Sequence, residues 1–286
     1  MRIMIILVSM LVELHTHTKY SRGTKVPVEG LNTPEEMVRH AAKLGLGAIA
    51  ITDHDQIKGA LEARKFAKKY DIIVIPGEEI TTASGHLLAV GVSEFIQPGM
   101  SVEDTIDEVH SQGGVAIGDH PFDIKNDGIK ELARLTDAIE VFNAINMERI
   151  TNWKSKRFAE LCKMPQVAGS DAHCIEMLGY GLNEINAGDI DGVLGAIKKG
   201  RVRVRTKYFP AHVLMRWSIT RLKLSYPHTL DYINRHYSWP KKAVSRKMLG
   251  LVKKSPGRVD YFFKGVTYFG LGSAVVYGAA KSLLGR

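Results

Sequence analysis

The sequence predicts an α/β fold in which parallel strands are joined by crossover helices. Over the first 200 residues, short apolar runs alternate with stretches of helical periodicity, the pattern of repeated βαβ units. Packets of histidine and carboxylate residues stand directly after these runs or at their first residue, where barrel folds gather their functional groups. The chain has 286 residues, 45% of them hydrophobic and 24% charged, which excludes a disordered or fibrous protein.

Seven apolar runs are predicted to form strands. They cover residues 5–14, 48–52, 72–76, 86–90, 115–118, 138–142 and 166–169. A first helix should begin at Thr33-Pro34-Glu35-Glu36, because threonine is a good N-cap, proline suits the first helical position and Glu36 can complete a capping box. Further helices should follow Asp55, follow Ser101 and cover residues 148–162.

The polar packets contain six of the eleven histidines. The packets are His15-Thr16-His17, Thr52-Asp53-His54-Asp55, Glu78-Glu79, Gly85-His86, Asp119-His120-Pro121 and Ser170-Asp171-Ala172-His173. Alternate residues of a strand point the same way, so the two histidines of the first packet can reach one ion. One packet alone could equally be structural, but together they provide enough nitrogen and carboxylate ligands for two or three metal ions.

In this order the packets resemble those of the PHP family, named for polymerase and histidinol phosphatase domains. The resemblance covers roughly residues 10–200 and includes Pro76-Gly77-Glu78-Glu79-Ile80. The last packet followed by Leu178-Gly179 also resembles the segment that closes stand-alone PHP phosphoesterases. It implies a distorted seven-stranded β/α barrel of PHP type. It also implies a bridging Glu79, with one metal ion on His15, His17, Glu79 and Asp171 and a second on Glu79, His86 and His120. Glu78 would then be a solvated or supporting carboxylate.

A third ion in some family members uses the histidine of the Thr-Asp-His-Asp packet, the last histidine and an aspartate soon after the first packet. His54 and His173 are present here, but Arg22 stands where many members have that aspartate. A guanidinium can bind two phosphate oxygens at once, which suggests a two-metal site with Arg22 as a phosphate clamp. A surface arginine beside Lys19 and Lys25 is the alternative interpretation.

The expected cofactors are two or three divalent ions. Imidazole and carboxylate ligands suit zinc, manganese or iron better than calcium or magnesium. Two such ions can share a hydroxide and hold phosphoryl oxygens, so the expected reaction is hydrolysis of a phosphomonoester or a nucleotide. His54, Asp53 and His173 are candidates to assist the leaving group. Glu140 and Asn143 either support the site or simply cap a strand end.

Charge divides the chain into two parts. Residues 201–286 contain 18 Lys or Arg and 2 acids, a net charge of +16, whereas the first 200 residues contain 21 bases and 28 acids, a net charge of −7. Thirteen of the 22 aromatic residues also lie beyond residue 200. We therefore expect a barrel domain at residues 1–205 and a basic, mainly helical C-terminal extension at residues 206–286.

The extension allows several interpretations. Within residues 261–285, Lys264 and Lys281 bracket 16 residues without charge, which could form a helix packed on the barrel, an interfacial anchor or a short membrane span. The positive charge and aromatic residues upstream suit an anionic membrane surface or a nucleic acid. Two alternatives to a small-molecule phosphoesterase follow: a nuclease that trims oligonucleotides held by the extension, and a non-catalytic scaffold that binds RNA or membrane.

Cysteine content and the first residues bear on location. Only Cys162 and Cys174 are present, which fits a reducing cytoplasm, with peripheral membrane association through the extension as a further possibility. Residues 1–12 are mostly apolar but too short to span a bilayer, so a first strand is expected there rather than a signal peptide. Translation could start at Met1 or at Met10.

Overall fold

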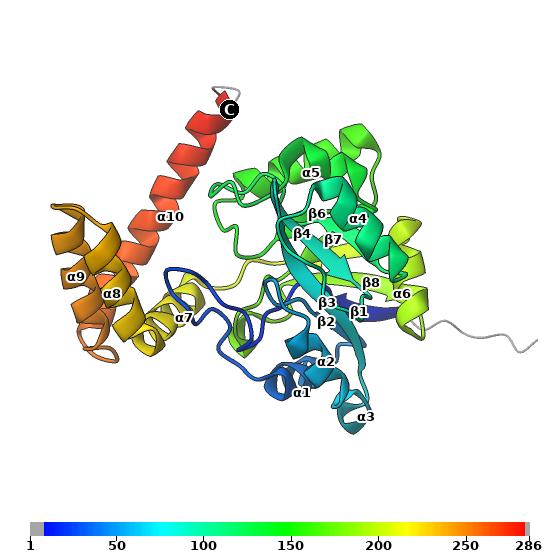
Figure 1. The fold of residues 1–286 in the computed structure, drawn as a ribbon, viewed down its shortest axis with the longest axis horizontal. Helices are drawn as coiled ribbons and strands as arrows, with labels where there is room; N and C mark the ends of the chain where they lie inside the picture. Colours follow the sequence, from blue (N-terminus) through cyan, green and yellow to red (C-terminus); the bar gives the residue numbers. More distant parts are fainter. Residues whose placement is uncertain (1–8, 284–286) are drawn as a thin grey trace, which may run out of the picture.

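The computed structural model describes residues 9–283 (Figure 1). Residues 5–8 of the first predicted strand, and Met1, lie outside this range. The elements are β1 (Ser9–Glu13), α1 (Pro34–Lys43), β2 (Ala48–Ile51), α2 (Lys58–Arg64), α3 (Ala67–Tyr70), β3 (Ile73–Thr82), β4 (Gly85–Val90), α4 (Val102–Ser111), β5 (Val115–Gly118), β6 (Ala138–Asn143), α5 (Ile150–Cys162), β7 (Gln166–Gly169), β8 (Gly181–Asn186), α6 (Ile190–Lys198), β9 (Arg203–Thr206), α7 (Ala211–Leu224), α8 (Tyr226–His236), α9 (Lys241–Val252) and α10 (Val259–Leu283). Two 3-10 helices lie at Lys130–Leu135 and Ile175–Met177.

One sheet forms a nearly closed barrel, and the α/β barrel class predicted from the sequence is confirmed. The strand order is β7-β6-β5-β4-β3-β2-β1-β8-β9. Strands β1 to β3 are mutually parallel, as are β5 to β7, whereas β4 pairs antiparallel with both β3 and β5. All seven predicted strands are present as β1 to β7, and β3 continues to Thr82, beyond its predicted end.

The sheet has nine strands rather than the seven expected. The additional strands β8 and β9 pair antiparallel with each other, and β8 pairs antiparallel with β1. Their sequences, GLNEIN and RVRT, are rich in polar residues: β8 alternates buried and more exposed positions, and β9, at an edge of the sheet, has no buried residue. Such strands lack the apolar run that predicts a buried strand.

Asn183 of β8 links the two ends of the curled sheet. Its Nδ2 donates to the carbonyl of Val12 in β1 (3.2 Å) and to that of Ala168 in β7 (2.7 Å). Its Oδ1 accepts a hydrogen bond from the Ala168 amide at 2.9 Å. Strands β7 and β8 are not paired through their backbones. The buried side-chain amide of Asn183 provides the donors and the acceptor that a neighbouring strand backbone would otherwise provide.

Apolar side chains fill the barrel and cover its outside. Residues such as Val12, Ile75 and Leu88 pack together inside, where α6 closes the base with Val193 and Ile197. A second apolar layer lies between the sheet and the surrounding helices. Because α6 occupies one end of the barrel, the carboxyl ends of the parallel strands are available at the other.

The predicted helix starts agree with the structure. Thr33 caps α1 and forms the capping box with Glu36, and Ser101 caps α4 by accepting from the Asp104 amide at 3.0 Å. Helix α2 follows Asp55, and α5 occupies most of the predicted range 148–162. These caps depend only on residues three apart, so sequence is sufficient to find them.

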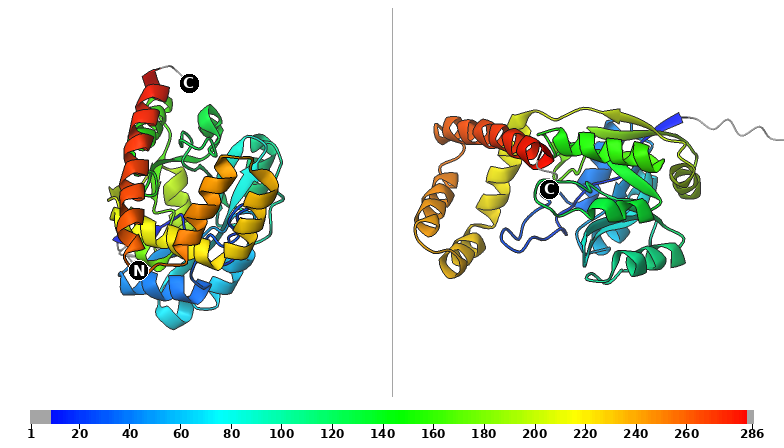
Figure 2. Two further views of the ribbon diagram at one scale, coloured as in Figure 1. Left: turned by 90° about the vertical axis from the view of Figure 1, so that its left-hand side faces the viewer. Right: turned by 90° about the horizontal axis from the view of Figure 1, so that it is seen from above.

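Helices α7 to α10 form a lobe beside the barrel (Figures 1 and 2). The loop at residues 19–32, blue in Figure 2, extends from the barrel to this lobe. There the Val28 amide donates to Ser225 Oγ at 3.0 Å, and Thr229 Oγ1 donates to the Lys25 carbonyl at 3.2 Å. Within residues 9–283, no helix is both long and apolar enough to cross a membrane.

Replacing Asn183 with leucine should destabilise the barrel. Leucine keeps the volume but leaves the Val12 carbonyl and both Ala168 backbone groups without these bonds. Each unpaired buried group costs about 1–3 kcal/mol, so the free energy of unfolding should fall by roughly 3 kcal/mol or more. Urea unfolding checks this, with Asn186→Leu, at an exposed position of the same strand, as the control. Equal stability of the two variants would contradict the role of Asn183 in joining the two ends of the sheet.

Candidate metal centre

The carboxylate of Glu79 lies among five imidazoles at the open end of the barrel. Its Oε2 lies 3.4 Å from His15 Nε2, 3.3 Å from His17 Nε2 and 3.0 Å from His54 Nδ1, and its Oε1 lies 2.9 Å from His86 Nδ1 and 3.1 Å from His120 Nε2. These side chains belong to segments that follow β1, β2 and β5 or that begin β4. The structure therefore brings five of the six histidines of the packets to Glu79, the carboxylate predicted to bridge two ions.

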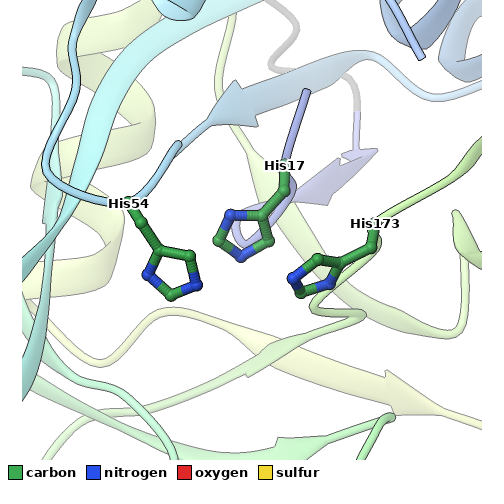
Figure 3. Close-up of side chains that lie close together, drawn as sticks. All are labelled: His17, His54 and His173. Carbon is green, nitrogen blue, oxygen red and sulfur yellow. The ribbon is translucent and has the colours of Figure 1, made fainter. Parts of the chain in front are cut away.

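Asp171 provides a second carboxylate beside the first. Its Oδ1 lies 3.1 Å from His17 Nε2, 3.7 Å from His15 Nε2 and 3.3 Å from His173 Nδ1. Figure 3 shows His17, His54 and His173 from three separate segments pointing into a common space. The ring of His17 lies 4.2 Å from that of His173 and 4.7 Å from that of His54, centroid to centroid.

Local backbone geometry explains the orientation of the first packet. Thr16 turns away from its two neighbours, because its hydroxyl donates to the Ala50 carbonyl at 2.6 Å. The imidazoles of His15 and His17 therefore share one side of the extended chain. Gly169 allows the close approach of β7, since a Cβ atom there would collide with Glu140 and with His15.

Glu140 and Asn143 contact the candidate ligands directly. Glu140 Oε1 lies 3.0 Å from His15 Nδ1, and its Oε2 accepts from the His120 amide at 2.9 Å. The amide of Asn143 donates to Glu140 at 3.0 Å and to Asp171 Oδ2 at 3.2 Å. Both residues thus hold candidate ligands in position, as partners of a metal site do.

Glu78 and Glu79 point to opposite sides of β3. Glu78 is fully buried outside the cluster, where one oxygen accepts from the Ile96 amide at 3.2 Å. Burial raises the pKa of Glu78 to about 8. The expectation of a solvated or supporting carboxylate was wrong, because strand alternation turns this side chain into the layer beneath the helices.

The imidazoles of the cluster favour the ionised forms of Glu79 and Asp171. Burial alone would raise the pKa of Glu79, but the neighbouring His54 and His86 hold it well below its ordinary range. The pKa of Asp171 is likewise well below its ordinary range, because His15 and His17 outweigh the effect of burial. Ionised carboxylates in this position are suitable ligands for a divalent cation.

Several buried atoms of the cluster lack a hydrogen-bond partner. They are His15 Nε2, His17 Nε2, His86 Nδ1, His120 Nδ1 and Glu79 Oε2. Buried polar atoms normally have partners, so unpaired nitrogens that face carboxylates indicate a place for a cation. The residues present therefore fit divalent metal ions.

Within residues 9–283, four groups of side chains each place their ligand atoms within 4.8 Å of one another. The groups are His15–His17–Asp171, His54–Glu79–His86, His15–Glu79–Asp119–His120, and His17–His54–His173. The first contains three of the four residues expected for one ion, and the second and third together contain all residues expected for another. The last contains the two histidines expected for a third ion.

Two carboxylates at the cluster, Asp119 and Glu29, were not among the predicted ligands. Asp119 is fully buried with Oδ2 3.2 Å from His120 Nε2, and burial raises its pKa to about 7. Its place directly before His120 was a usable signal. Glu29 Oε2 lies 3.5 Å from His54 Nε2, although Glu29 belongs to no packet.

A cavity of about 380 Å³ opens over the cluster. His54, His86, His120, Asp171 and His173 lie in its wall, whereas His15 and His17 are buried beneath. Three cationic side chains, Arg22, Lys125 and Arg221, also line it. Asp53 does not, because both its oxygens accept hydrogen bonds from Thr18, at 2.6 and 2.7 Å.

Helix α7 contributes part of the cavity wall. The indole N–H of Trp217 donates to the Glu29 carbonyl at 2.8 Å, and its ring lies 4.9 Å from that of His173. The Arg221 guanidinium lies 4.4 Å from the Trp217 ring centre and 3.7 Å from Glu29 Oε1. The predicted extension thus takes part in the site, which its charge pattern alone did not indicate.

Comparison with known proteins agrees with this geometry. The family model described as PHP domain matches residues 13–151, and the one described as PHP-associated matches residues 149–202. An uncharacterized protein of Methanocaldococcus jannaschii is 36% identical over 147 residues, which cover 49% of this chain and 85% of that protein. The protein belongs to the PHP family. Family membership and the side-chain cluster together support a metal-dependent hydrolase.

Other relatives share shorter parts or only the fold. The error-prone DNA polymerase of Mycobacterium tuberculosis is 42% identical over 69 residues, which are 24% of this PHP chain but 6% of the polymerase. The solved structure of PsfC from Pseudomonas syringae superposes with a TM-score of 0.51 at 17% identity. That match covers 76% of this chain and 99% of PsfC, and it is a likeness of fold.

Glu79→Gln should lose bound metal, whereas Glu78→Gln should keep it. The first change removes a charge shared by two of the four ligand groups, and we expect metal affinity to fall by about tenfold or more. The second replaces a buried carboxyl, neutral below its raised pKa of about 8, with a neutral side chain of similar shape. Elemental analysis after equilibrium dialysis measures both. Equal metal content in the two variants would contradict the assignment of Glu79.

Proposed function

We propose that this protein is a metal-dependent phosphoesterase that hydrolyses a phosphomonoester or a nucleotide. The observation that carries the proposal is the set of adjacent ligand groups, two of which share Glu79, at a cavity whose wall includes three cationic side chains among its carboxylates. Divalent ions bound there would lower the pKa of a coordinated water and neutralise phosphoryl oxygens. Manganese, zinc or iron suits this ligand set, because imidazole nitrogen predominates in it.

Arg221 and Arg22 are proposed to bind the substrate phosphate. Arg221 is positioned by the Trp217 ring and by Glu29, so little rotational freedom is lost when it pairs with an anion. Arg22 is exposed at the rim of the same cavity and retains the clamp role suggested by the sequence. The proposed site then combines the barrel, residues 1–205, with the extension, residues 206–286.

The leaving group is proposed to receive its proton on the side of His54 and His173. Both histidines line the cavity, and the His54 side chain is 18% exposed. Asp53, the other candidate, accepts two hydrogen bonds from Thr18. Its proposed role is therefore to hold the loop after β1 in place rather than to transfer a proton. An imidazole at the cavity wall can reach an ester oxygen that enters from solvent.

The size of the cavity favours a small substrate. A volume of about 380 Å³ is at the lower end for small-molecule sites, which span roughly 300–1,000 Å³. A phosphomonoester or a mononucleotide fits such a volume better than a longer oligonucleotide. The same assay can therefore distinguish the phosphoesterase from the two alternatives, a nuclease and a non-catalytic scaffold.

Purified protein, supplied in turn with manganese, zinc and iron, should release phosphate from p-nitrophenyl phosphate or a nucleoside bisphosphate. The Glu79→Gln variant should lose that release, since it lacks the shared carboxylate. Bis-p-nitrophenyl phosphate and short oligonucleotides complete the panel. Hydrolysis of oligonucleotides alone would show that the protein is a nuclease rather than a small-molecule phosphoesterase. Absence of hydrolysis with every ion would favour a non-catalytic scaffold.

Arg221→Gln should weaken phosphate binding without removing metal. Loss of one charge-assisted pair is worth about 2 kcal/mol, so KM should rise by roughly 30-fold while metal content stays unchanged. Arg216→Gln is the matched control, because Arg216 lies on the same helix but pairs with Glu176 at 3.0 Å outside the cavity. Inhibition by inorganic phosphate should weaken in parallel with KM. An unchanged KM in Arg221→Gln would exclude the phosphate contact.

A further inference from the structure

Helix α10 exposes two adjacent stripes of large apolar residues. Tyr261, Tyr268 and Val275 are 81%, 56% and 43% exposed, and their neighbours Phe262, Phe269 and Val276 are 46%, 78% and 70% exposed. Members of each stripe are seven residues apart, so they lie on one side of the helix. Contiguous exposed apolar surface of this kind marks an interaction site.

Positive charge lies next to these stripes along the chain. The basic segment, residues 241–264, comprises α9 and the start of α10 and contains eight Lys or Arg and a single acid, Asp260. Its bases are Lys241, Lys242, Arg246, Lys247, Lys253, Lys254, Arg258 and Lys264. Among the ion pairs of residues 9–283, none involves these eight side chains. They are therefore available to an anionic partner.

An apolar groove lies in the same lobe. Its volume is about 520 Å³, and it opens among α7, α8, α9 and α10. Met215, Leu222, Met248 and Leu271 are among the residues that line it. The groove has no ionisable residue in its wall, so it suits hydrocarbon rather than a charged group.

Charge and side-chain type distinguish the occupants that this face could take. A second copy would bring together two extensions of net charge +13 each, from 15 Lys or Arg and 2 acids in residues 206–286, and Gly265 and Gly272 interrupt the continuous seam that helix pairing requires. A nucleic acid would use the bases and the aromatic rings but would leave exposed Val275 and Val276 without a partner. A lipid surface accommodates all three classes of side chain.

We propose that α10 and the basic segment dock on the surface of an anionic lipid bilayer. The stripes would lie at the boundary between headgroups and acyl chains, and the eight bases would contact anionic headgroups. Docking of this kind is peripheral, in keeping with the finding that no helix of residues 9–283 can span a membrane. It is independent of the proposed catalytic activity.

Co-sedimentation of the full-length protein with vesicles tests this proposal. Vesicles of phosphatidylcholine with phosphatidylserine should capture the protein, and vesicles of phosphatidylcholine alone should capture little. Phe269→Ser combined with Val276→Ser should weaken capture by about tenfold or more, since two apolar side chains lose their burial. The matched control is Phe95→Ser combined with Leu161→Ser, because these residues are 48% and 71% exposed on the barrel. Its capture should equal that of the unaltered protein.

A second variant separates charge from apolar contact. Lys254→Glu combined with Arg258→Glu should also weaken capture, and added salt should reduce but not abolish binding of the unaltered protein. Absence of capture by anionic vesicles, or equal capture of the α10 and control variants, would overturn the proposal. Steeply salt-dependent binding to single-stranded RNA that the α10 variant retains would assign the lobe to nucleic acid instead. Dimerisation that the α10 variant abolishes would assign the face to a second copy.

Discussion

The interaction of Glu79 with five surrounding imidazoles is the constraint on which the rest of the site depends. A fully buried carboxylate is costly unless positive charge or hydrogen-bond donors surround it, and here the imidazoles arrive from four different segments. Their convergence requires that the ends of separate strands keep fixed positions. The hydrogen bonds of Asn183 join the ends of the sheet, and α6 packs against the base of the barrel. The geometry of the site therefore depends on the closure of the barrel.

The basic extension contributes to the site as well as to the surface. Trp217 and Arg221 reach Glu29 on the long loop of the barrel, which joins the positively charged part of the chain to the negatively charged part. A carboxylate and a guanidinium thus stand together beside His54. The folded chain thereby joins the long loop and α7 at the wall of the cavity that Arg22 also lines.

The lobe formed by α7 to α10 has two faces with different chemistry. One face, on α7, completes the cavity with an indole and a guanidinium. The other, on α10, exposes aromatic and aliphatic side chains, and the bases of residues 241–264 take part in no ion pair among residues 9–283. Because α7 belongs to both the cavity wall and the lobe, the proposed membrane contact and the proposed phosphoesterase would be held in a fixed relation.

The sequence by itself determined the features that depend on near neighbours. Strands β1 to β7, the capping box of Thr33 and the paired histidines of the first packet follow from periodicities of two to four residues, and the order of the packets was enough for the family. Only the tertiary structure decided the closing role of Asn183, the polar strands β8 and β9, and the meeting of Glu29 with α7. Glu29 and Trp217 are 188 residues apart, and no local pattern records a contact that the folded chain alone brings about.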